Sequence, residues 1–158
     1  MAHIIKNDAI IDSPMSISAG DGDLSLPNII VPLVAWNEDP ALRERKDIGV
    51  WLTTDEEVEA IEGDLNGLAV IALEFPMFAD GRSFSNANIL RRRLGYSGEI
   101  RAIGDVRRDQ MEQMHRCGFD AYQLAEGQDI EATLAGFKRF THAYQQSIDR
   151  PEPLFRHR

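Results

Sequence analysis

Residues 80–85, with the sequence DGRSFS, carry groups that could bind an anion. The free N–H groups at the start of a helix and the Arg82 guanidinium are suited to phosphate, sulfate, sulfite or carboxylate. Gly81 permits a tight turn, and Ser83 or Ser85 can cap the helix that follows. The alternative is an ordinary strand-to-helix turn in which Asp80 pairs with Arg82 or with another arginine.

Residues 104–110, with the sequence GDVRRDQ, add two carboxylates at helical spacing. Asp105 can cap a helix, and Asp109 would face nearly the same way four residues later. Such a pair could bind a cation or transfer protons, but a cap and an arginine partner are the commoner roles. We therefore predict no metal site and keep Asp80, Asp105 and Asp109 as the candidate catalytic groups.

Arginines concentrate in residues 78–116. This segment holds eight arginines and five acidic residues, a net charge of +3, in a chain whose net charge is −9. Charge asymmetry of this kind can mark a binding surface, although a solvated helix face gives the same pattern. We add Arg101 to the anion-binding candidates and expect Arg91 and Arg93 to dock a partner or another element, with Arg92 merely solvated.

The hydrophobic pattern predicts strands and helices in alternation. A short hairpin is expected over residues 3–11, with a turn at Asn7-Asp8, and a loop or arm over residues 12–28. The expected strands are 28–36, 47–54, 68–75, 99–105 and 121–125. The expected helices are 38–46, 55–65, 83–96, 106–117 and 130–146, with Thr54 as the candidate cap of the second.

This alternation predicts a single α/β domain with a mainly parallel sheet of five strands after residue 28. An open three-layer arrangement is the main prediction, and a half-barrel of β/α units is the alternative. In both, ligands gather at the carboxyl ends of the strands, where the two polar loops lie. The predicted division is an N-terminal hairpin and arm (1–28), the α/β domain (29–148) and a C-terminal tail (149–158).

Composition narrows the function classes. The acidic balance argues against nucleic-acid binding, and no apolar run is long enough to span a membrane. The N-terminus lacks a signal-peptide pattern, and the single cysteine, Cys117, excludes an intrachain disulfide, so we expect a cytoplasmic protein. No cofactor motif is evident. Because Cys117 is expected at a helix C-terminus before an apolar residue, we predict a buried neutral thiol.

The motifs together resemble the bacterial family called domain of unknown function 934. The resemblance rests on E-F-P at 74–76, on F-x-D-G-R-x-x-S-x-A-x-x-L-R-x-R from Phe78 to Arg93, and on R-C-G-F-D at 116–120. It rests also on G-x-[IL]-R-A-x-G-D-x-x-x-D-Q from Gly98 to Gln110. The match is dense over residues 68–124 and looser over 29–67.

The resemblance implies an association with sulfite reduction, because members are labelled putative oxidoreductases encoded beside sulfite reductase. The first hypothesis is therefore an accessory protein of assimilatory sulfite reduction, with sulfite reductase or another sulfur-assimilation enzyme as its partner. The second is a small-anion-binding enzyme or sensor with its site at loops 80–85 and 104–109. The third is a purely structural subunit, and homo-oligomers are compatible with all three.

Overall fold

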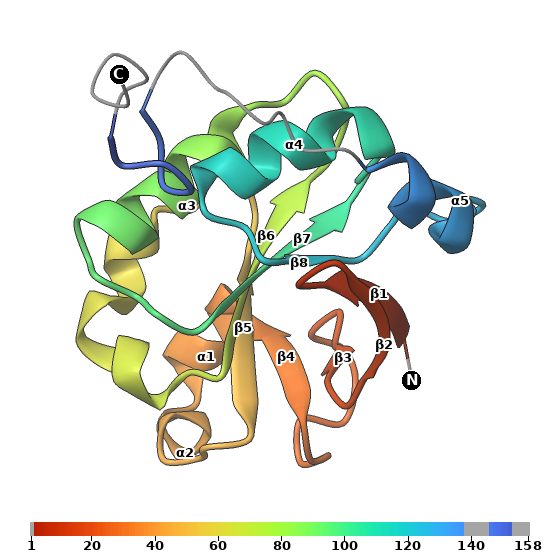
Figure 1. The fold of residues 1–158 in the computed structure, drawn as a ribbon. Helices are drawn as coiled ribbons and strands as arrows, with labels where there is room; N and C mark the ends of the chain where they lie inside the picture. Colours follow the sequence, from red (N-terminus) through yellow and green to blue (C-terminus); the bar gives the residue numbers. More distant parts are fainter. Residues whose placement is uncertain (1, 138–145, 153–158) are drawn as a thin grey trace.

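A computed structural model describes residues 2–137 and 146–152 of the chain. Its described part forms one sheet of eight strands accompanied by helices (Figure 1). The strands are β1 (Ala2–Lys6), β2 (Ala9–Ser13), β3 (Ser16–Ile17), β4 (Ile29–Pro32), β5 (Ile48–Leu52), β6 (Val70–Phe75), β7 (Glu99–Gly104) and β8 (Ala121–Tyr122). The α-helices are α1 (Leu33–Glu38), α2 (Pro40–Arg43), α3 (Arg82–Arg92), α4 (Arg108–Cys117) and α5 (Ile130–Gly136), and η1 (Val58–Gly67) is a 3₁₀ helix.

The sheet is mixed, with the strand order β2-β1-β8-β7-β6-β5-β4-β3. Neighbouring strands from β3 to β8 run parallel, whereas β1 pairs antiparallel with both β8 and β2. Strands β4 to β8 fall within the five ranges expected from the sequence. The expected hairpin is also present, since Asn7 and Asp8 adopt the positive φ angles of a two-residue turn between β1 and β2.

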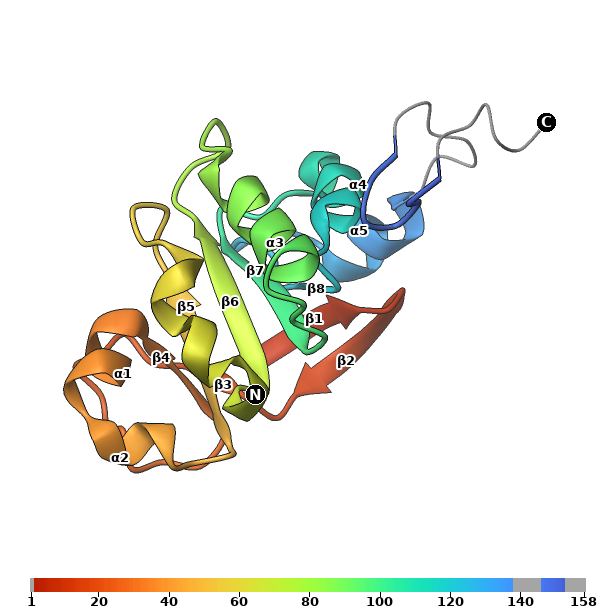
Figure 2. The same cartoon turned by 90° about the vertical axis from the view of Figure 1, so that its left-hand side faces the viewer.

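A single N-terminal segment brings the two edges of this sheet together. Residues 9–13 pair with β1 at one edge, and the same segment continues past Pro14 to pair with β4 at the other edge through residues 16–17. Figures 1 and 2 follow it from the hairpin to β3. The sheet therefore curls into a nearly closed barrel. The prediction of a loop over 12–28 missed β3, and the open three-layer arrangement is wrong because the second face of the sheet lines the barrel lumen.

The apolar residues of the strands divide between the outside and the lumen of the barrel. In β6, Ile71, Leu73 and Phe75 pack outward in the main core with helix residues, whereas Val70 and Ala72 belong to a smaller inner cluster. The other buried members of that inner cluster are Met15, Ile30 and Ile103. This alternation is the period of two of a β-strand with both faces covered.

A charged cluster shares the lumen with these apolar residues. Arg101, which is 1% exposed, pairs with Glu99 at 2.7 Å, and Glu99 also binds the Lys6 ammonium at 2.6 Å. Arg101 donates a further hydrogen bond of 2.9 Å to the Ser13 hydroxyl. The cluster thus ties β7 to both strands of the N-terminal hairpin. Because a buried ion pair must offset a large desolvation cost, removal of one partner is far more damaging than its presence is stabilising.

Several element boundaries differ from the sequence predictions. The expected strand over 28–36 stops at Pro32. Pro32 has an extended backbone and is the cap residue of α1, which begins at Leu33. The expected helix over 55–65 is instead the 3₁₀ helix η1, whose cap position is Glu57, so the Thr54 cap was wrong. Helix α5 ends at Gly136, and residues 138–145 of the predicted helix over 130–146 lie outside the described residues.

No helix among the residues that the structure describes is long and apolar enough to cross a membrane.

Gly104 is a point where the fold tolerates no side chain. It ends β7 with φ = +89°, and an added Cβ would collide with the Phe75 carbonyl oxygen. We predict that Gly104→Ala lowers the free energy of unfolding by about 2 kcal/mol or more, from backbone strain and the collision together. Urea unfolding followed by circular dichroism measures this. Gly63→Ala is the control, because nothing lies within 4 Å of its added Cβ; equal effects of the two variants would contradict the prediction.

Candidate functional site

The loops β6–α3 and β7–α4 lie side by side at the carboxyl ends of the central strands. Strands β6 and β7 are parallel neighbours in register from Val70↔Glu99 to Phe75↔Gly104, so both loops leave the barrel at the same level. The Asp105 amide donates to the Phe75 carbonyl at 2.7 Å and joins them directly. The sequence prediction that these loops meet is therefore matched by the geometry.

Asp80 and Arg82 are bound to each other. Asp80 accepts from the Arg82 backbone amide and from its guanidinium at 2.7–3.1 Å, and Arg82 also pairs with Asp55. The Arg82 side chain lowers the pKa of Asp80 to about 2, chiefly through the side-chain hydrogen bond. Two carboxylates thus already surround the guanidinium that was expected to clamp an anion, which matches the alternative of an ordinary ion-paired turn.

The two serines do not cap α3. Ser83 is fully buried, and its hydroxyl donates to the Glu74 carbonyl at 2.5 Å. Ser85 lies in a shallow groove with Phe84, Asn88, Ile89 and Cys117. The helix cap position is Gly81, and Asp80 supplies the side-chain acceptor for the first helical amide. The expectation of a serine cap was wrong, because α3 begins at Arg82 and both serines lie inside its first turn.

Asp105 and Asp109 do not form a pair. Helix α4 has Arg107 at its cap position without a side-chain cap bond, so the prediction of an Asp105 cap was wrong. Asp105 instead binds Arg107 at 2.8 Å and accepts the Phe78 amide, and both contacts lower its pKa. The Asp109 side chain is 77% exposed and lies 3.9 Å from Arg108. Among the described residues, no group of three or more His, Cys, Asp or Glu side chains could hold a metal ion.

The other candidate arginines lie elsewhere. Arg101 lies in the lumen and contacts neither loop. The Arg91 guanidinium makes its contacts within the chain. It donates hydrogen bonds of 2.7–2.9 Å to backbone carbonyls and lies 3.5 Å from Asp120. Arg93 is exposed and pairs with Glu59. Of the two arginines expected to dock a partner, Arg93 is therefore the one on the surface.

These contacts hold a loop that exposes two apolar side chains. Met77 is 60% exposed and Phe78 is 52% exposed. Asp105 accepts the Phe78 amide, and the Gln110 side chain donates to the Phe78 carbonyl at 2.9 Å. Sequence reasoning recorded Phe78 and Gln110 as motif residues but gave them no role. The available signal was the apolar stretch from Met77 to Ala79 directly before the turn residues Asp80 and Gly81.

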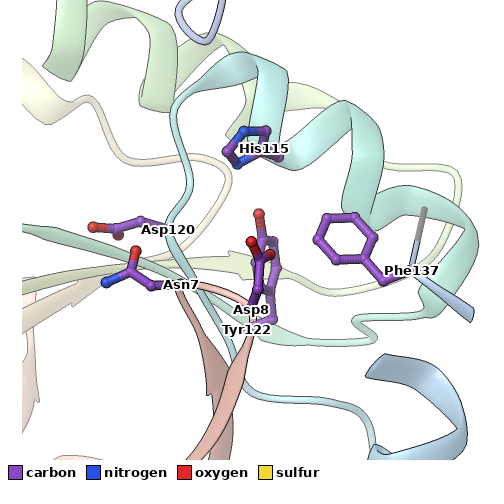
Figure 3. A pocket seen from close by; sticks show the side chains of 6 residues that line it. All are labelled: Asn7, Asp8, His115, Asp120, Tyr122 and Phe137. Atoms are coloured by element: carbon purple, nitrogen blue, oxygen red, sulfur yellow. The ribbon is translucent and has the colours of Figure 1, made fainter. Parts of the chain in front are cut away.

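A pocket lies at the opposite, amino end of the parallel strands (Figure 3). Its volume is about 180 Å³, and it is lined by Asn7, Asp8, His115, Asp120, Tyr122 and Phe137. Tyr122 and Phe137 form an edge-to-face aromatic pair at 6.0 Å. Burial raises the pKa of Asp120, although its carboxylate accepts the Ile100 amide and lies near Arg91. Sequence reasoning missed this pocket, because it expected ligands only at the carboxyl ends.

Cys117 is buried, as the sequence predicted. It is 6% exposed at the end of α4, which terminates at Gly118 in the left-handed conformation. The thiol accepts a hydrogen bond from Gln113 at 3.5 Å, but burial raises its pKa, so the neutral form is favoured. These features do not suit a nucleophile.

The fold and this site define an α/β protein with a nearly closed mixed barrel and a loop at its strand ends that exposes two apolar side chains. The chain belongs to the family described as "Bacterial protein of unknown function (DUF934)", which matches residues 49–155. The match contains both loops and Cys117, whereas β1 to β4, with the segment that closes the barrel, precede it. Neither the curated proteins nor the solved structures gave a significant match.

The Asp80–Arg82 pair has a titration signature. Because the pKa of Asp80 is about 2 in the folded protein and 3.8 for an unperturbed aspartate, the pair stabilises the fold above pH 3.8 and loses its effect as the pH falls through about 2. We predict an NMR titration midpoint of the Asp80 carboxyl near 2, and a rise toward 3.8 in Arg82→Gln. Arg92→Gln is the control, and a midpoint near 3.8 in the unaltered protein would refute the pairing.

The burial of Cys117 can be tested by thiol labelling. We predict that an aromatic disulfide reagent modifies folded protein at least a hundredfold more slowly than protein in denaturant, because the thiol is both buried and neutral. Absorbance at neutral pH follows the reaction. Rapid labelling of folded protein would contradict the assignment.

Proposed function

We propose that this protein is a non-catalytic accessory protein of assimilatory sulfite reduction, which docks onto sulfite reductase or another sulfur-assimilation enzyme through the Met77–Phe78 loop. The proposal rests on the observation that the polar groups of the loops already bind one another. Asp80, Arg82 and Asp105 are engaged within the chain, and the loop they stabilise presents two apolar side chains to solvent.

The energetics of such a loop suit binding. An aromatic side chain that enters a pocket of a partner is a frequent source of binding energy, worth 2 kcal/mol or more at a hot spot (roughly thirtyfold in affinity). The backbone of Phe78 is held at its amide by Asp105 and at its carbonyl by Gln110. Since the loop is already ordered, association loses less conformational entropy than it would with a flexible loop.

The choice of partner rests on the family. The resemblance implies that the protein is encoded beside sulfite reductase. A partner of this kind would place the protein in the cytoplasm. The label of oxidoreductase has less support, because no cofactor motif is evident and the single thiol is buried and neutral. A docking role therefore accounts for the geometry more directly than an oxidoreductase role.

A second candidate function is small-anion binding at the same end of the barrel. An open cleft of about 380 Å³ lies between the starts of α4 and α5, and both Arg107 and Arg108 line it. Asp109 and Asp129 also line the cleft, and their negative charges disfavour the binding of an anion. The docking proposal remains the stronger one, because Arg107 is already paired with Asp105.

The docking proposal predicts a loop-specific loss of binding. We expect the double variant Met77→Ser/Phe78→Ser to weaken binding to purified sulfite reductase by roughly a hundredfold or more, with an unchanged melting temperature. Biolayer interferometry measures the affinity. Leu26→Ser is the matched control, because Leu26 is 52% exposed and lies outside the loop. Absence of binding by the unaltered protein, or equal losses in both variants, would refute the proposal.

A further inference from the structure

We infer that the barrel lumen contains a binding site for a small oxyanion that carries a single negative charge and at least one proton, formed by Arg101 and Gln123. Hydrogen carbonate, dihydrogen phosphate and hydrogen sulfite share the required chemistry. This site is separate from the docking loop, and the inference does not depend on the proposed function.

The guanidinium of Arg101 has unused hydrogen-bonding capacity in a buried place. Its Nε and Nη2 atoms lie 2.7 Å from one Glu99 oxygen, and Nη2 also donates to Ser13. Nη1 is buried and has no partner. A buried donor without a partner costs about 1–3 kcal/mol, and more when it is charged, so an acceptor is required beside it.

Gln123, which directly follows β8, supplies a second unpartnered atom. Its backbone N–H donates to the Ala102 carbonyl at 2.9 Å and extends the ladder between β7 and β8. Tyr122 packs outward in the main core, so the alternation along the strand turns Gln123 toward the lumen. The Oε1 atom of Gln123 is buried and has no partner.

The residues around Arg101 are small. In the sheet register, Arg101 lies between Ala72 of β6 and Ala121 of β8. Gln123 follows Ala121 by two residues, which makes it the diagonal neighbour of Arg101 on the lumen side. Neither alanine has a side chain that could accept a hydrogen bond from the Nη1 atom.

Charge and hydrogen bonding together specify the ligand. Arg101 and Lys6 share the single carboxylate of Glu99, so this cluster carries one excess positive charge. Glu74 lies further along β6 on the lumen side and disfavours a dianion. A ligand must accept from Nη1 and donate to the Gln123 oxygen. A protonated oxyanion with one negative charge offers both groups, whereas sulfate, nitrate and chloride lack the donor.

Isothermal titration calorimetry of the whole chain tests this site with six sodium salts. We expect saturable binding of hydrogen carbonate, dihydrogen phosphate or hydrogen sulfite, and affinity at least tenfold weaker for sulfate, nitrate and chloride. Gln123→Leu should weaken binding about tenfold, the loss of one hydrogen bond. Gln146→Leu, which alters an exposed glutamine outside both candidate anion sites, is the matched control and should bind as the unaltered protein does.

Arg101→Lys provides a second variant, because it keeps the charge but lacks Nη1. It should bind at least tenfold more weakly when circular dichroism shows that it folds, and Gln123→Leu carries the test if it does not. Saturable binding that Gln123→Leu weakens and Gln146→Leu leaves unchanged supports the site. Binding of none of the protonated anions, binding of sulfate with equal affinity, or equal binding by Gln123→Leu and the unaltered protein would overturn it.

Discussion

The ion cluster of Arg101, Glu99 and Lys6 is the interaction on which the barrel depends. Strand β1 pairs with β8 over two residues, and β3 pairs with β4 over two residues, so main-chain pairing alone holds the N-terminal segment weakly. The charged side chains add contacts from β7 to Lys6 and Ser13, across the lumen face. Because these charges are buried, a different arrangement of the segment would leave at least one of them without a partner.

Closure of the barrel in turn determines what the two ends of the molecule can do. The inner apolar cluster and the charged residues line the lumen, and the carboxyl-end loops are held by contacts among themselves. The β6–α3 loop depends on Asp105 and Gln110 from the next unit along the chain. This cross-connection explains why residues separated by about thirty positions belong to one structural unit, and why a short loop can expose Phe78 without losing its shape.

The main elements could be predicted from the sequence to a useful extent. The apolar run 68–75 becomes β6, the hairpin turn at Asn7-Asp8 is present, and α4 ends at Gly118 as expected. These features depend on local backbone preferences and hydrophobic period, which are properties of short segments. The predictions that a serine caps α3 and that Asp105 caps α4 were wrong, because these side chains bind other groups in the tertiary structure. Ser83 binds the Glu74 carbonyl, and Asp105 binds Arg107.

The sequence by itself determined the alternation of strands and helices, the proximity of the two motif loops and the burial of the lone thiol. Each follows from periodicity or from the parallel direction of neighbouring strands. Only the tertiary structure decided that residues 9–17 join both sheet edges, that Arg101 lies inside the barrel, and that Asp80 and Arg82 bind each other. Those outcomes depend on contacts between distant segments, and the composition of a segment does not specify which distant partner its polar groups will meet.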